Sequence, residues 1–140
     1  MSPELSHLFQ FHSPSFKRLH IELCAPLGDD DVDKLVQATV EVLAERPQVR
    51  EVLIDMRKLV DCVTSVQTGF GSLQKLLGRR GMRTAWLSNS GRMHGLSRVV
   101  VTRVADPNAA TCITMGEVEA WFADTRGRFE VLKANAGRKP

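Results

Sequence analysis

The stretch Val49-Arg50-Glu51-Val52-Leu53-Ile54-Asp55 is the strongest indication of the fold. Its centre, Val52 to Ile54, is a compact apolar run. Such a run predicts a strand that is covered on both faces, as in a parallel sheet. Parallel strands are joined by crossover connections that are usually helical, so helices are expected before and after this strand.

Both flanking segments have helical patterns. Gly28 and the aspartates 29–31 predict a helix start, because carboxylates cap free amides and favour the positive end of the helix dipole. This helix should end near Arg46, before Pro47. Its apolar stripe is Val32, Leu35, Val36, Val40 and Leu43. A second helix is predicted from about Ser65 to Gly78, in which Gly69 and Gly71 would allow close packing against a neighbour.

The remainder of the chain continues the alternation of strands and helices. Arg83–Leu87 and Ala110–Ile113 are predicted strands, and a helix with apolar residues at intervals of three or four is predicted between them, up to Val104. The motif from Thr114 to Glu117 matches a capping box and predicts a last helix.

The chain is expected to begin with a hairpin. Apolar and polar residues alternate over Arg18–Leu23, which predicts a half-buried strand. Leu8–Phe11 is a second short candidate strand, and Ser13-Pro14-Ser15 is the predicted turn between them.

The predicted fold class is therefore α/β: one domain with a mostly parallel central sheet, an antiparallel N-terminal edge hairpin and about four helices. Residues 1–125 form the predicted domain, and residues 126–140 a basic tail whose end is expected to be disordered. The 140 residues suffice for one core. No apolar run is long enough to span a bilayer, and Cys24, Cys62 and Cys112 show no CxxC spacing. We expect a cytoplasmic protein with reduced thiols and no cofactor or metal.

The order of these segments resembles the SpoIIAA-like branch of the STAS domains (sulfate transporter and anti-sigma factor antagonist). The resemblance covers residues 8–123. It rests on the strand at Arg18–Leu23, the Asp-rich helix start, Val52–Asp55, Arg83–Leu87, and the closing segment from Ala110 to Phe122.

This resemblance implies an interaction domain that regulates a protein partner and is not an enzyme. In relatives of this type, a partner kinase phosphorylates Ser or Thr at the start of the second helix, in a motif like Asp-Ser-Ser-Gly. The matching residues are Val63-Thr64-Ser65-Val66, with Ser65 at the acceptor position and valines in place of the Asp and the Gly. The alternative is that Ser65 only caps the helix.

The loop from Asp55 to Ser65 follows a parallel strand, at the edge where open α/β sheets usually bind ligands. Its polar residues form a predicted regulatory or partner-binding loop: Asp55, Arg57, Lys58, Asp61, Thr64 and Ser65. A second, basic set is a candidate patch for an anion or an acidic partner: Arg79, Arg80, Arg83, Arg92, His94 and Arg98. Aromatic residues are not interleaved there, and the net charge is only +3, which argues against nucleic acid.

The preferred function is a non-enzymatic, STAS-like regulatory domain of a bacterial cytosolic protein, with an unidentified protein partner. Homodimerisation through the edge hairpin is a further hypothesis. Two alternatives remain open. One is a carrier or sensor of a small apolar ligand, held around Phe70, Leu73 and Met93. The other is an enzyme that uses Asp55, Asp61 and His94, which would require these groups to converge.

Overall fold

The computed structural model describes residues 5–61 and 65–124, which form a five-stranded sheet and four helices. The elements follow the chain as β1 (Phe9–Ser15), β2 (Arg18–Leu23), α1 (Asp29–Glu45), β3 (Glu51–Asp55), α2 (Val66–Arg79), β4 (Arg83–Leu87), α3 (Gly91–Val104), β5 (Ala109–Cys112) and α4 (Met115–Ala123). No helix of this described part is long and apolar enough to cross a membrane.

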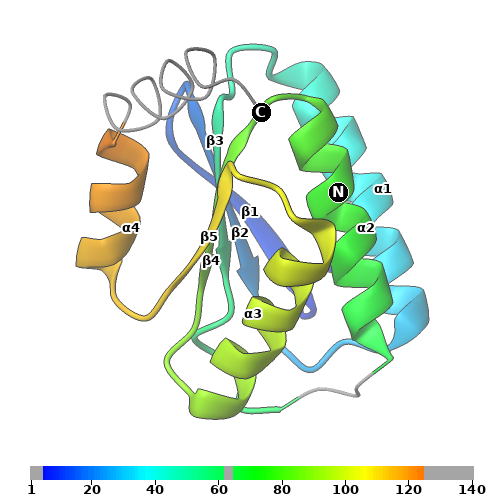
Figure 1. The fold of residues 1–140 in the computed structure, drawn as a ribbon. Coiled ribbons are helices and arrows are strands. Elements are labelled where there is room, and N and C mark those ends of the chain that lie inside the picture. The colour runs from blue at the N-terminus through cyan, green and yellow to red at the C-terminus, as the bar shows by residue number, and fades with distance from the viewer. Residues whose placement is uncertain (1–4, 62–64, 125–140) are drawn as a thin grey trace.

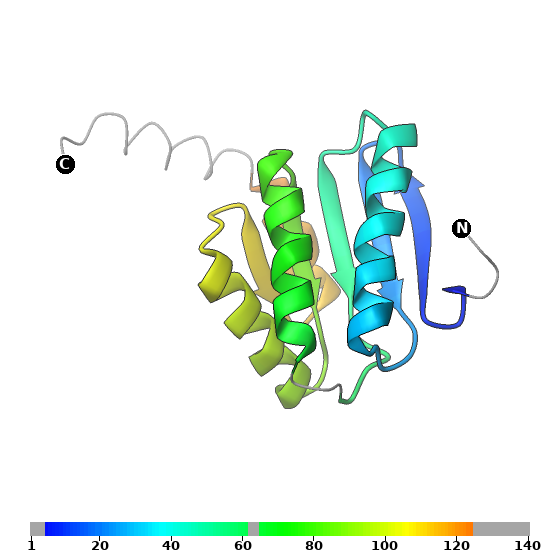
Figure 2. The same ribbon diagram turned by 90° about the vertical axis from the view of Figure 1, so that its right-hand side faces the viewer.

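The strands lie in the order β1-β2-β3-β4-β5. The pair β1 and β2 is antiparallel, and the other three pairs are parallel. Of the described helices, α1, α2 and α3 cover one face of the sheet and α4 covers the other (Figures 1 and 2). Three crossovers that advance in one direction place their helices on one face when all have the same hand. The predicted fold class is therefore confirmed.

Two apolar clusters fill the two faces. The larger lies between the sheet and α1–α3, and it includes the fully buried Phe70 and Trp86. The smaller lies under α4 and joins Leu53 and Leu87 to Phe122. Because the middle strands contribute side chains to both clusters, β3 has the uninterrupted apolar run expected of a strand that is covered on both sides.

The hairpin differs from its prediction. β1 continues through Ser13-Pro14-Ser15, the segment predicted to be a turn, and the chain reverses at Phe16 and Lys17. Pro14 is tolerated because β1 is an edge strand and the register shifts between His12 and Ser15. The residues Ser13-Pro14-Ser15 therefore mark an irregularity within β1 and not the turn that was predicted.

The capping prediction for α4 is half confirmed. The Thr114 hydroxyl accepts a hydrogen bond from the Glu117 amide at 3.1 Å. The Glu117 carboxylate accepts one from the amide of Ile113 at 3.2 Å, one residue before the position that a full capping box requires.

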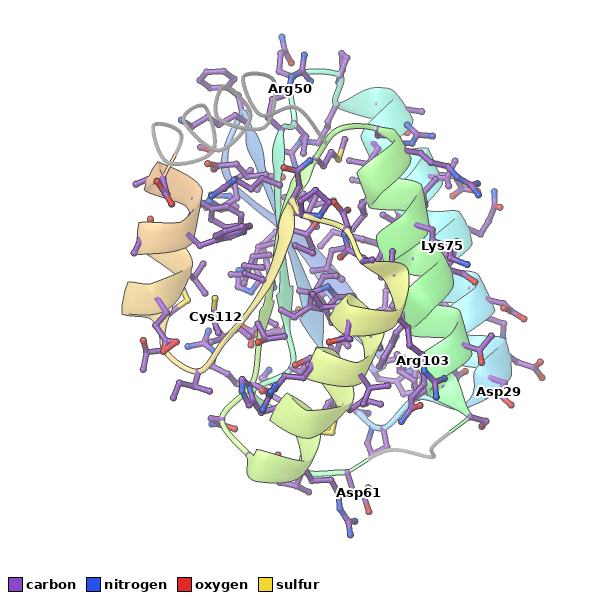
Figure 3. The ribbon with its side chains drawn as sticks, viewed as in Figure 1. Asp29, Arg50, Asp61, Lys75, Arg103 and Cys112 are labelled. Carbon is purple, nitrogen blue, oxygen red and sulfur yellow. The ribbon has the colours of Figure 1, made fainter. Side chains whose placement is uncertain are left out.

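The elements define two ends of the molecule. We call the end where β2–β5 finish and α1–α4 begin the carboxyl edge, and the opposite end the amino edge. Figure 3 shows Asp61 and Asp29 at the former and Arg50 at the latter. The predicted loop from Asp55 to Ser65 lies at the carboxyl edge.

Candidate functional site at the carboxyl edge

Asp55 is the anchor of the predicted loop. It ends β3, is 2% exposed, and accepts hydrogen bonds from two side chains. His20 on β2 donates through Nε2 at 3.0 Å, and Arg57 donates through Nε and Nη2 at 3.0 and 2.8 Å. The Arg57 amide adds a fourth bond at 3.0 Å. Burial alone would raise the pKa of Asp55, but the bonds from His20 and Arg57 outweigh it and hold this pKa well below its ordinary range.

Glu22 and its partners form a second polar group beside Asp55. They lie on the face of β1 and β2 that α4 does not cover. Glu22 contacts Lys58 at 3.4 Å and His12 at 3.5 Å. Burial raises the pKa of Glu22, but the contacts with His12, Lys58 and Cys24 lower it by more. Lys58 and Arg57 therefore connect the loop to two adjacent strands. Sequence reasoning missed His20 and Glu22, whose signal was only their place on the polar side of an alternating strand.

Two buried apolar side chains and a backbone hydrogen bond also fix the loop on the protein core. Met56 and Leu59 are 0% and 1% exposed, and the Met56 amide donates to the Leu87 carbonyl at 2.7 Å. Asp61 contacts Arg92 in the first turn of α3 at 2.6 Å, and both side chains are exposed. Thr64 lies outside the described residues, as do Cys62 and Val63.

Ser65 stands at the N-cap position of α2 and is exposed, and its side chain makes no capping hydrogen bond. It lines a groove of about 360 Å³ between α1 and α2. Asp29 and Asp33 of α1 line the same groove, together with Thr68 and Ser72 of α2. Ser65 therefore faces an acidic helix start, which sequence spacing could not reveal.

The candidate basic patch is not one surface, which corrects the interpretation from sequence. Arg79 and Arg80 end α2 at the amino edge, whereas Arg92 and His94 belong to the first turn of α3 at the carboxyl edge. The sequence places them together only because a single strand, β4, lies between them. Arg98 is exposed in the middle of α3.

Arg83 is not a surface residue at all. Arg83 is 5% exposed, and its Cζ atom lies 3.6 Å from the centre of the Trp121 ring. Its side chain donates hydrogen bonds to the carbonyls of Trp121 and Asp124. Its role in the described structure is to dock α4 on the sheet.

The residues of the two alternative hypotheses are placed as follows. Asp55 is bound by His20 and Arg57, Asp61 pairs with Arg92, and the Nδ1 atom of His94 is buried without a hydrogen-bond partner. The enzyme hypothesis thus has no direct support from the partners of its three residues. Phe70, Leu73 and Met93 are fully buried core residues, so the carrier hypothesis has none either. Within residues 5–61 and 65–124, no group of three His, Cys, Asp or Glu side chains is placed to hold a metal.

Comparisons with known proteins identify the fold. No family model and no curated protein sequence matches the chain. Among solved structures, the anti-sigma factor antagonist SpoIIAA in its unphosphorylated form is similar, with a TM-score of 0.61, 13% identity, and coverage of 80% of this chain and 94% of that one. The phosphorylated form of the Bacillus cell fate determinant SpoIIAA is similar with a TM-score of 0.55, 15% identity, and coverage of 80% and 97%. The chain thus has the SpoIIAA-like STAS fold, as its sequence predicted.

Proposed function

We propose that this chain is a non-enzymatic regulatory domain that binds a protein partner at its carboxyl edge. The fold is that of an anti-sigma factor antagonist. The described edge presents an acidic groove and a loop that is fixed by Asp55 and by the buried Met56 and Leu59. A rigid frame that carries exposed polar side chains is suited to recognition, because little order has to be gained on binding.

We propose further that Ser65 is the regulatory phosphoacceptor. The observation that carries this proposal is its exposed side chain, which makes no capping bond at the start of α2. SpoIIAA has been solved in an unphosphorylated and a phosphorylated form. A phosphate at a helix start is favoured by the helix dipole.

Phosphorylation would change the charge of the groove strongly. A phosphate adds about −1.5 to −2 charges, which would lie across the groove from Asp29 and Asp33. The negative charge that a partner encounters at the groove therefore differs between the unmodified and the phosphorylated protein. The phosphate is the proposed switch between them.

The test begins with protein purified from its own cells. Cleavage after Lys58 and Lys75 gives the peptide 59–75, and fragmentation of this peptide by mass spectrometry separates phosphate on Ser65 from phosphate on Thr64 or Thr68. We expect the phosphate on Ser65, its loss in Ser65→Ala, and its retention in Thr68→Ala, a matched change one turn further along α2. Phosphate only on another residue, or none under any growth condition, would refute the assignment to Ser65.

Partner binding is tested separately. Protein captured by the unmodified chain should be released by Ser65→Asp, which imitates the added charge, and retained by Thr102→Asp, which adds the same charge at an exposed position of α3 outside the groove. Equal capture by both variants would show that charge at Ser65 does not control partner binding. Binding of a partner at another surface would not be contradicted by that result.

A further inference from the structure

The amino edge, opposite Ser65, carries a group of exposed basic side chains that we call the amino-edge cluster: Lys17, Arg50, Arg79 and Arg80. The backbone brings them to one end of the molecule. The Arg50 amide donates to the Lys17 carbonyl at 2.7 Å, and the Arg83 amide donates to the Arg50 carbonyl at 3.0 Å. Arg46 and Arg80 are the C-cap residues of α1 and α2, which end here.

The basic side chains of this cluster outnumber the acidic side chains near them. Lys17, Arg50, Arg79 and Arg80 are exposed, and the described ion pairs include none of them. Arg18 at the same edge differs, because Glu51 and Glu119 neutralise it. Glu45, Asp106 and Asp124 are the acidic residues near the ends of α1, α3 and α4, and Asp106 lies beside Gly78 at the end of α2. The exposed cations therefore produce a positive potential at this end.

An aromatic side chain projects from the same end. Phe16 forms the tip of the β1–β2 hairpin and is 73% exposed, next to Lys17. A large apolar side chain at a protruding turn gains free energy when it leaves water. Together with cations around it, this is the chemistry of surfaces that bind lipid headgroups, where the aromatic ring enters the interface and the cations meet phosphates.

We propose that the amino edge docks on the surface of an anionic lipid bilayer, with Phe16 inserted at the headgroup level and the amino-edge cluster on the lipid phosphates. The described structure ends at this edge, with Asp124, and the following residues 126–140 contain five more basic residues and one acidic residue. A nucleic acid would also attract the cations. It would, however, favour several stacking aromatics interleaved with them, and the described amino edge presents one aromatic tip.

The proposal goes beyond the proposed function, because it concerns the opposite end of the molecule. The full chain is sedimented with vesicles of phosphatidylcholine alone and with vesicles that also contain phosphatidylglycerol. We expect binding to the anionic vesicles only, and weaker binding at high salt. Phe16→Ser and the double variant Arg79→Glu/Arg80→Glu should each weaken it by roughly tenfold or more.

Matched controls keep the test specific. Val60→Ser removes an apolar side chain that is 74% exposed at the carboxyl edge, and Lys34→Glu/Arg98→Glu makes the same change of charge on exposed helix faces. Both should bind like the unmodified chain. No binding to anionic vesicles would overturn the proposal, and so would binding that the Phe16 and arginine variants leave intact. Charge-dependent binding of a single-stranded oligonucleotide without vesicle binding would assign the cluster to nucleic acid and overturn it as well.

Discussion

Asp55 is an almost fully buried carboxylate whose described hydrogen bonds all come from His20 and Arg57. Asp55→Asn removes the charge but keeps the shape. We expect it to lower the free energy of unfolding by about 2 kcal/mol at neutral pH, because the His20 and Arg57 donors lose a charged acceptor. Chemical denaturation at several pH values measures this.

The pH dependence of the unfolding free energy shows whether the charge of Asp55 stabilises the fold. The folded-state pKa of Asp55 is depressed, so its contribution is present above the ordinary carboxyl pKa of about 4 and is lost as the pH falls from there toward the folded-state pKa. The difference between Asp55→Asn and the unmodified chain should therefore shrink below about pH 4. Asp61→Asn, at an exposed position, is the control. A difference that stays constant with pH would mean that the charge of Asp55 does not stabilise the fold.

Gly69 is required by close contact between two helices. A Cβ atom at this position would lie 2.4 Å from Cγ1 of Val32 on α1. Gly69→Ala should cost about 1–3 kcal/mol of unfolding free energy, since α1 and α2 must move apart. Gly71→Ala is the matched variant, because its Cβ would lie 3.8 Å from Val104, an ordinary contact. It should be neutral or stabilising by up to about 1 kcal/mol. Equal effects of the two changes would contradict the packing argument.

At the scale of elements, α4 depends on a few contacts because no other described helix packs beside it on its face of the sheet (Figure 1). Arg83 stacks on Trp121 and donates to two carbonyls at the end of α4, while the indole nitrogen of Trp121 donates to the Thr84 carbonyl at 2.9 Å. Arg83→Met should therefore loosen α4 selectively and cost about 1–3 kcal/mol.

Hydrogen exchange of backbone amides tests this selectivity. Residues 115–123 should lose protection in Arg83→Met, while amides of α1 and α2 should lose little beyond the global change. Arg98→Met, at an exposed position of α3, should leave the pattern unchanged. A uniform loss of protection would show that α4 is not a separate unit of stability.

Elements were predictable from sequence where one pattern governed a whole segment. The α1 and α2 bounds differ from the predicted ones by a residue or so, because capping and apolar stripes are local signals. The prediction for β1 was wrong because Pro14 disfavours an interior strand, and the edge position of β1 together with its register shift makes Pro14 acceptable. That position is a property of the assembled sheet.

At the scale of the whole molecule, the sequence predicted where the loop lies but not which residues of other strands bond to it. Asp55 could be placed at the end of a parallel strand, whereas its bond to His20 joins residues 35 positions apart and depends on strand register. The basic patch failed for the converse reason. Arg80 and Arg92 are near in sequence, but one strand carries the chain from the amino edge to the carboxyl edge between them.

The opposed ends of the sheet also decide where the protein can be labelled. Leu8 bonds to Cys24 near the end of β2, so the first described residues leave from the carboxyl edge, whereas Asp124 is held by Arg83 at the amino edge. A label attached at residue 5 would therefore lie at the same end of the molecule as Ser65 and the α1–α2 groove. A label attached at residue 124 would lie at the end that carries Phe16 and the exposed arginines. Labels at these two positions therefore form a pair, each leaving the opposite end of the molecule unobstructed.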